Sequence, residues 1–213
     1  LSDSEFPFMS MKEGYISGLP ARLFRISFTG ELCYEINVPA RYGLALWQVL
    51  INAGKAHGIT PYGTEAMHVL RAEKGFIIVG QETDGTVTPI DLGMDWILSK
   101  KKNDFIGKRA LERASMADPK RKQLVGLRTI NPDCVIPEGA HVVLDPDQPL
   151  PMDMLGHVTS SYASPSLGHS IALALVKGGH KRHGETAWIP MLNGQPPIQA
   201  IITNTVFYDA QGD

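Results

Sequence analysis

Apolar and polar residues alternate in two short runs near the beginning of the chain. The first run occupies residues 24–28, the second occupies residues 32–38, and Thr29-Gly30-Glu31 separates them. An alternation of period two is typical of β-strands, and a glycine-containing interruption is typical of the turn between them. We therefore predict a β-hairpin with one apolar face, whose other face carries four polar side chains: Arg25, Ser27, Glu35 and Asn37.

Helical spacing replaces this alternation in the residues that follow. Apolar side chains recur four positions apart in residues 39–54, which predicts an amphipathic helix. Residues 63–75 carry a second apolar stripe between a threonine and a glycine, which are typical of helix ends. Residues 104–116 favour a further helix. The segment 85–93 contains Thr88-Pro89 and then an aspartate, an order typical of the first turn of a helix.

The pattern changes after Asp118-Pro119. From there onward, short β-rich runs alternate with glycine, proline, asparagine and aspartate. Strands spaced in this way favour a small barrel or sandwich. We predict an α+β protein in which the helices precede Asp118 and almost none follow it, with two domains at residues 1–118 and 119–213.

The overall composition is that of a globular protein without a marked charge. The chain has 213 residues, of which 43% are hydrophobic, and its formal net charge is −2 at pH 7. This charge gives no reason to expect nucleic acid or a membrane surface as the main partner. The two cysteines form no CxxC, no apolar run approaches the ~20 residues of a membrane span, and the first residues are acidic and polar. We therefore expect a cytoplasmic protein without a signal peptide.

Several familiar cofactor and metal motifs are missing from the sequence. It contains no GxGxxG turn, no phosphate-binding loop and no GxSxG. His180 and His183 are close in sequence, but Lys181 and Arg182 lie between them, and their positive charges would repel a metal cation. We therefore expect no metal site.

Glu35 has two interpretations. It can be a solvated residue at the edge of the hairpin, paired with Arg25 in an ion pair worth less than about 1 kcal/mol. It can also anchor a ligand, because a carboxylate accepts two parallel N–H bonds from a flat amidine-like edge. A 2-amino-4-oxopyrimidine, the edge of a pterin, presents that geometry.

Five motifs, in order along the chain, resemble the folate-binding aminomethyltransferase superfamily, which includes the T-protein of the glycine cleavage system. They are "RISFTGELCYEINVP", "GTEAMHVLRAEKG", "DGTVTPIDLGMDW", "KNDFIGKRAL" and "GHVTSSYASPSLGHSIALALV". Within that superfamily the chain resembles the C-terminal part of the α subunits of heterotetrameric sarcosine oxidases. The resemblance implies a T-protein-like cloverleaf around tetrahydrofolate. This chain would supply its ferredoxin-like-type α/β portion and a C-terminal antiparallel β-barrel.

The resemblance also implies which residues bind the folate cofactor. In the family motif YTGExxYEI the last glutamate binds the pterin edge, and it corresponds to Glu35. The aromatic residue that opens the motif is Phe28, which keeps a stacking role without a hydroxyl group. Tyr34 matches the later tyrosine of the motif, and Trp96 matches an aromatic residue that lines the same cavity. The catalytic aspartate of the family lies upstream of these motifs, so no catalytic residue is assigned here.

Two positions on the second expected helix differ from T-proteins. Where T-proteins read ARDxLRLE, this chain reads AMHVLRAE, so that Met67 replaces a ligand-contacting arginine and His68 replaces the aspartate. Arg71 matches the later arginine and is interpreted as structural. These differences favour the sarcosine oxidase branch over a glycine-cleavage T-protein.

The function that the resemblance implies is oxidative demethylation of sarcosine to glycine with release of H2O2. The one-carbon unit would pass to tetrahydrofolate as 5,10-methylenetetrahydrofolate. FAD, FMN and NAD would be bound in the intact assembly but not by this chain, whose partners would be the other sarcosine oxidase subunits. The isolated chain would be inactive. A dimethylglycine-type or other folate-dependent demethylase, and a catalytically silent module that contacts partner subunits, are the alternatives.

Overall fold

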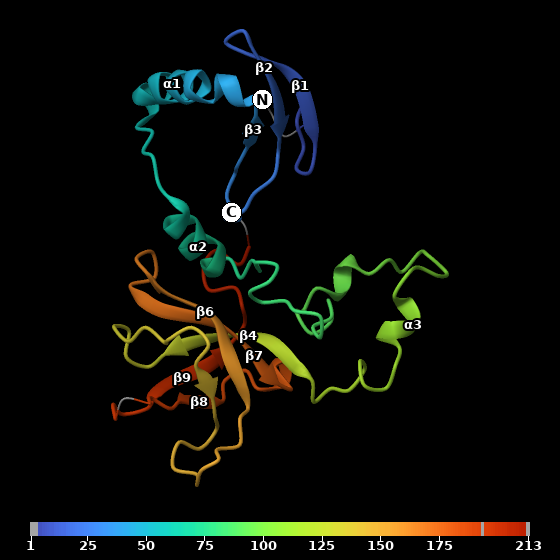
Figure 1. Ribbon diagram of the computed structural model, residues 1–213, viewed down its shortest axis with the longest axis vertical. Coiled ribbons are helices and arrows are strands. Elements are labelled where there is room, and N and C mark those ends of the chain that lie inside the picture. Colours follow the sequence, from blue (N-terminus) through green and yellow to red (C-terminus); the bar gives the residue numbers. More distant parts are fainter. Residues whose placement is uncertain (1–3, 193, 212–213) are drawn as a thin grey trace. The chain divides into compact units, whose positions relative to one another are not determined.

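A computed structural model describes residues 4–192 and 194–211 of the chain (Figure 1). The chain divides into two compact units, one ending at Leu70 and one beginning at Arg71. Each unit is described by itself. The division into domains at residues 1–118 and 119–213 stays a prediction from the sequence.

The first unit contains a three-stranded antiparallel sheet in the order β1-β2-β3. Its strands are β1 (Met11–Ile16), β2 (Leu19–Phe24) and β3 (Glu35–Asn37). Ser17 and Gly18, both with positive φ, make the tight turn between β1 and β2, a conformation that suits the right-handed twist of a hairpin. The sequence prediction missed β1 because its apolar and polar residues do not alternate. The Ser-Gly pair was the available signal.

The predicted hairpin is only partly present: its second strand contains β3, but of its first strand, residues 24–28, only Phe24 belongs to a strand. Phe24 pairs with Glu35, and the whole segment 25–34 forms the connection instead of Thr29-Gly30-Glu31 alone. Arg25 leaves the hairpin because its backbone exchanges hydrogen bonds with the residues before β1. Its N–H donates to Ser10 at 3.0 Å, and its carbonyl accepts from Met9 at 2.8 Å. The run 24–28 therefore alternates in sequence without continuing the β2–β3 ladder.

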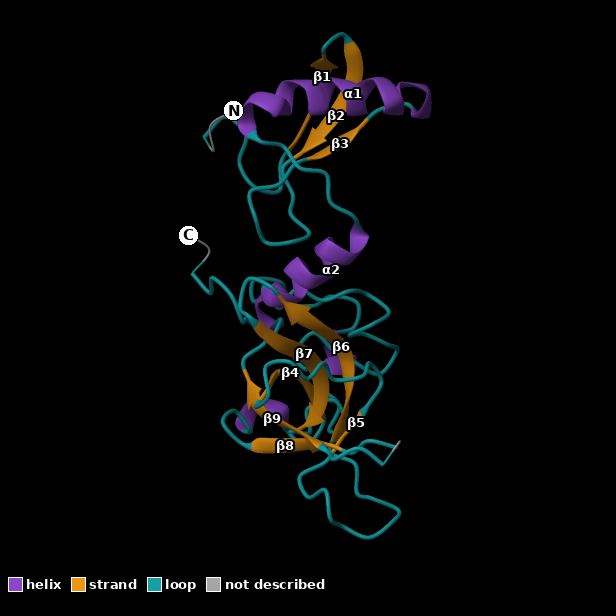
Figure 2. Cartoon of the chain, turned by 90° about the vertical axis from the view of Figure 1, so that its left-hand side faces the viewer, coloured by secondary structure: helices purple, strands orange, loops and turns teal. Residues whose placement is uncertain are grey.

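The first two predicted helices are confirmed. Helix α1 (Gly43–Gly54) lies beside the sheet and is flanked by the 3₁₀ turns η1 (Ala40–Tyr42) and η2 (Lys55–His57) (Figure 2). Helix α2 (Thr64–Glu73) is followed by Gly75, whose φ is +71°. A Cβ at Gly75 would lie 2.6 Å from the carbonyl oxygen of Thr205, so this position requires glycine for both conformation and space.

Of the next two predicted helices, one is shorter than expected and the other is absent. Helix α3 (Lys108–Leu111) covers four residues of the predicted 104–116. Residues 85–93 make a single turn, in which the amide of Leu92 donates to the carbonyl of Pro89, and Gly93, with φ +70°, ends it. No helix forms in this segment, so the prediction of a helix start was wrong; Gly93, two residues after Asp91, ends the turn before a helix can form. A short 3₁₀ turn, η3 (Asp95–Ile97), follows.

The second unit is a six-stranded antiparallel sheet that curls into a nearly closed barrel. The strands are β4 (Lys122–Thr129), β5 (His141–Val142), β6 (Gly156–Ser164), β7 (His169–Lys177), β8 (Thr186–Ile189) and β9 (Ile198–Thr203). Their order is β5-β6-β7-β4-β9-β8 (Figures 1 and 2). Val143 and Trp188 join the two ends through a pair of backbone hydrogen bonds, each 2.9 Å long.

The barrel encloses the main core. One side of each strand points inward, and the inward side chains are buried Val, Leu, Ile and Ala residues: Val125, Leu127, Val142, Val158, Ala172, Ala174, Val176, Ala187, Ile189, Ala200 and Ile202. After Asp118 the described residues contain only one short helical turn, η4 (Gly179–Lys181). The α+β prediction, with helices first and a barrel after, is confirmed. In the described part of the chain, no helix is long and apolar enough to cross a lipid bilayer.

Candidate functional site

Glu35 is the first residue of β3, and its side chain is exposed. Its Oε1 accepts a hydrogen bond of 2.8 Å from Nδ2 of Asn37, two residues further along the strand. Residues two apart in a strand share a face, which explains this pairing. Within the described residues, the other carboxylate oxygen, Oε2, accepts no hydrogen bond. The carboxylate is thus oriented on one side and open on the other.

The polar face around Glu35 is not the one the sequence predicted. Asn37 faces Arg22 across the β2–β3 ladder, and Arg22 faces Glu13 across the β1–β2 ladder. Arg22 Nε donates to Glu13 Oε1 at 3.0 Å, and about two-thirds of each side chain is exposed. Arg25 and Ser27, which were expected on this face, lie in the connection instead. The register of β1, which the prediction missed, determines which residues replace them.

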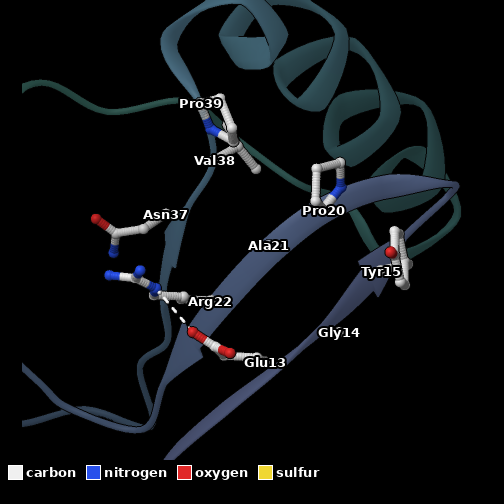
Figure 3. Close-up of a pocket in the computed structure, with 9 residues that line it drawn as sticks. All are labelled: Glu13, Gly14, Tyr15, Pro20, Ala21, Arg22, Asn37, Val38 and Pro39. Carbon is white, nitrogen blue, oxygen red and sulfur yellow. Dashed lines mark hydrogen bonds and ion pairs between the residues drawn. The ribbon is translucent and has the colours of Figure 1, made fainter.

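A hollow of about 700 Å³ adjoins this row of polar side chains (Figure 3). In Figure 3 the side chains of Asn37 and Arg22 approach each other from neighbouring strands, and Arg22 reaches the carboxylate of Glu13. The residues that line the hollow are Glu13, Gly14, Tyr15, Pro20, Ala21, Arg22, Asn37, Val38 and Pro39. Its volume lies within the roughly 300–1,000 Å³ of small-molecule sites. Asn37 therefore joins Glu35 to a space that could accept a ligand.

Aromatic rings lie on the connection that leads to Glu35. Tyr34 stacks on Phe6, with ring centroids 6.0 Å apart and an angle of 7° between the planes. The guanidinium carbon of Arg25 lies 5.4 Å from the centroid of the Tyr34 ring. Arg25 thus interacts with an aromatic face, a contact of about 0.5–1 kcal/mol at exposed sites. Tyr34 is 40% exposed, so part of its surface is available to a ligand.

Phe28 contacts the second helix and not Glu35. Its ring centroid lies 6.5 Å from that of His68, which occupies the position where T-proteins carry aspartate. The sequence comparison noted His68 as a departure but gave no signal for this contact. Phe28 is 45% exposed, and its stacking on a pterin remains a prediction.

Trp96 belongs to the second unit. It lies in η3 and is 72% exposed. Phe28, Tyr34 and Glu35 belong to the first unit. The place of Trp96 in the same cavity as Glu35 therefore remains a prediction.

Arg71, interpreted from the sequence as structural, is completely buried. Its Nη1 donates to Oε2 of Glu82 and to the carbonyl of Phe76, at 3.0 and 3.1 Å. Its Nη2 donates to the hydroxyl groups of Ser160 and Tyr162, at 2.7 and 3.2 Å. These contacts attach the end of α2 to β6, so the structural interpretation holds.

Glu82 is the residue that sequence reasoning missed. It has no exposed surface, and besides Arg71 it accepts hydrogen bonds from the amide of Ile78, at 2.7 Å, and from the hydroxyl of Ser160. Ser160 is 78 residues away in the sequence, so no local pattern could have paired the two.

A second buried carboxylate, Asp91, stabilises the turn before the barrel. Its Oδ2 accepts from Arg121 Nη2 at 2.7 Å, from the Thr88 amide at 2.9 Å and from the Thr88 hydroxyl at 2.8 Å. Burial acts to raise the pKa of Asp91, but the hydrogen bonds from Arg121 and Thr88 outweigh it. The pKa of Asp91 therefore lies below its ordinary value of 3.8.

We expect Asp91→Asn to remove a pH-dependent part of the stability. Because the folded state lowers the pKa, this carboxylate stabilises the fold above the unfolded-state pKa and loses that effect as pH falls through the folded-state pKa. Urea denaturation at pH 7 should show the variant less stable than the wild type. At about pH 2–3 the difference should shrink, since both side chains are then increasingly neutral. An equal difference at both pH values would contradict this account.

Metal binding has no support in the described part of the chain. No group of three or more His, Cys, Asp or Glu side chains there could hold a metal ion.

Comparison with known proteins agrees with the fold and with the motifs. Residues 1–102 match the family model of the GCVT N-terminal domain, and residues 122–209 match that of the glycine cleavage T-protein C-terminal barrel domain. The sarcosine oxidase subunit alpha of Corynebacterium sp. (strain P-1) is 48% identical over 100% of the chain, which corresponds to 22% of that protein. The chain thus spans about a fifth of the length of such relatives.

Shorter relatives and a solved structure extend the comparison. The aminomethyltransferase of Thermoanaerobacter pseudethanolicus is 34% identical over 96% of this chain and 53% of its own length. The crystal structure of the glycine cleavage system aminomethyltransferase T from Bartonella henselae superposes with a TM-score of 0.80 at 26% identity. That match covers 99% of this chain and 55% of the other. The chain therefore belongs to the glycine cleavage T-protein (aminomethyltransferase) family.

Proposed function

We propose that this chain is the folate-binding C-terminal part of a sarcosine oxidase α subunit. The observation that carries the proposal is the state of Glu35, an exposed carboxylate held by Asn37 on one oxygen and open on the other. The match over the whole chain to sarcosine oxidase subunits supports the choice within the family.

The residues present suit a pterin. Its pyrimidine edge offers two parallel N–H donors, and a carboxylate accepts such a pair in the way it accepts arginine. Oε2 of Glu35 is open, and Oε1 keeps a lone pair beyond the one that Asn37 uses. Bound tetrahydrofolate would supply the nitrogen atoms that take up the one-carbon unit. The contribution of Glu35 would be to hold and orient the pterin.

The overall reaction that we propose for the intact enzyme consumes sarcosine, oxygen and tetrahydrofolate. Its products are glycine, hydrogen peroxide and 5,10-methylenetetrahydrofolate. Sarcosine would be oxidised outside this chain, with flavins and other subunits of the assembly. The residues of this chain would position tetrahydrofolate, the acceptor of the one-carbon unit. Such positioning can lower the activation barrier of the transfer substantially.

Three measurements on the purified chain test this division of roles. Titration with tetrahydrofolate in a calorimeter should give a saturable signal if the chain holds the pterin, whereas a structural module would give none. The same preparation should show no stoichiometric flavin absorbance and should release no peroxide from sarcosine. Peroxide release by the chain alone would contradict the proposal that oxidation occurs elsewhere.

A further inference from the structure

A groove lies on the outer surface of the barrel, where the segment after β9 crosses over β4. The crossing needs Gly126, because a Cβ there would lie 2.3 Å from the carbonyl oxygen of Asn204 and 2.7 Å from Cζ of Phe207. Phe207 then packs against the outward side chains of β4 and β7: Leu124, Leu173 and Leu175. Two residues beyond Gly126, Arg128 points to the same outer side of β4 but is exposed. The crossing segment thus forms a wall beside Arg128.

The groove has the size of a small-ligand site. One part has a volume of about 270 Å³, and its lining includes Arg128, His169, Ile171, Thr203, Val206 and Phe207. An adjoining part of about 210 Å³ shares Arg128, His169 and Thr203 and adds Thr129, Ile130 and Ile201. Volumes below the roughly 300–1,000 Å³ of drug-sized sites suit a small molecule.

The groove favours an anion. Among the residues that the structure describes, no aspartate or glutamate lines either part. Within the described residues, the guanidinium of Arg128 has no carboxylate partner. A planar guanidinium binds a carboxylate through two parallel hydrogen bonds, so a carboxylate is the group that fits Arg128.

Two further polar groups of the groove, on His169 and Thr203, are hydrogen-bond acceptors and favour a donor on the ligand. Nδ1 of His169 lies 2.8 Å from the carbonyl oxygen of Ser170, and since a carbonyl only accepts, Nδ1 carries the proton. In this tautomer Nε2 carries a lone pair and is an acceptor. The hydroxyl of Thr203 donates to the carbonyl of Asn204 at 3.0 Å, which leaves its oxygen as an acceptor too. Two acceptors beside one guanidinium suit a carboxylate with a neighbouring N–H.

We propose that this groove binds a small N-acyl amino acid, a site separate from the polar sheet face around Glu35. Its carboxylate pairs with Arg128, its amide N–H donates to His169 or Thr203, and its acyl group rests on the apolar part of the groove. That part is formed by Ile171, Val206 and Phe207. The inference depends only on the barrel and stands whether or not the chain binds folate.

The test uses N-benzoylglycine as the probe and the full chain as the protein. Titration followed by amide NMR should give saturable shifts at His169, Thr203 and Asn204. Arg128→Gln should weaken binding by at least tenfold, and Thr203→Val should weaken it by less. Arg109→Gln, which removes an exposed arginine of α3 that does not line the groove, should leave affinity unchanged. Circular dichroism of each variant shows whether the fold is kept.

Each alternative outcome is decisive. Benzoate, which lacks the N–H, should bind more weakly than N-benzoylglycine, and equal affinity would contradict the donor assignment. Inorganic phosphate that competes as well as the probe would show a site for bare anions instead. Absence of saturable shifts, shifts outside the groove, or an Arg109→Gln loss as large as that of Arg128→Gln would overturn the proposal.

Discussion

Replacing Arg71 by methionine is expected to lower the free energy of unfolding by about 3–5 kcal/mol, the usual cost of breaking a buried ion pair from one side. Both side chains of the Arg71–Glu82 pair have no exposed surface. The variant would leave the Glu82 carboxylate buried without its cation, and the hydroxyl of Tyr162 would lose a donor. Urea denaturation of the variant and the wild type measures the difference.

A matched control separates burial from charge. Arg182 and Glu185 in the same unit form an ion pair of 2.7 Å, but their side chains are 28% and 45% exposed. Arg182→Met should cost less than about 1 kcal/mol, because solvent screens such pairs. Similar losses for the two variants would show that the buried network contributes no more than a surface pair.

Glu35→Ala in the intact enzyme should weaken tetrahydrofolate binding at least about tenfold, which corresponds to ~1.4 kcal/mol. Two charge-assisted hydrogen bonds are at stake, each worth roughly 1.5–3 kcal/mol, and they are not additive. Under the proposed function, sarcosine oxidation should persist, and the one-carbon unit should appear as formaldehyde. Glu35→Gln should be nearly as harmful, because the amide presents N–H groups to one of the pterin donors. Calorimetric titration gives the dissociation constants.

The control for this prediction is Glu65→Ala. Glu65 is exposed in the first turn of α2 and has no assigned contact with folate. The substitution Glu65→Ala changes the net charge of the first unit by the same amount as Glu35→Ala does. If Glu35→Ala and the wild type bind folate equally, Glu35 is a solvated edge residue and the ligand-anchor interpretation fails.

The parts of the fold that the sequence predicted are those with strong local patterns. Helices α1 and α2 follow from apolar spacing closed by Gly54 and Gly75, and the barrel strands follow from β-rich runs separated by turn residues. The sequence also indicated Glu35 and assigned Arg71 a structural role. In both cases the role of the residue was inferred from the family motif, because the hydrophobic pattern alone did not assign one.

The parts that were missed depend on contacts between distant residues. The predicted turn of the hairpin was too short because the backbone of Arg25 pairs with Ser10 and Met9, which precede β1. Strand β1 itself was missed because its apolar and polar residues do not alternate. That strand, β1, fixes which side chains surround Asn37. The buried role of Glu82 was not predicted, because Ser160, one of its hydrogen-bond partners, lies beside it only when β6 has formed.

Closure of the barrel by Val143 and Trp188 has a consequence for self-association. Strand edges with free N–H and C=O groups act as templates for pairing with other chains, and a closed sheet removes them. The three-stranded sheet differs, because β1 and β3 are its outer strands. Lys12 and Glu13 place two charges on β1, a common protection against edge-to-edge pairing. Despite these charges, the small sheet keeps two outer strands, so intermolecular strand pairing in this chain should begin there and not at the barrel.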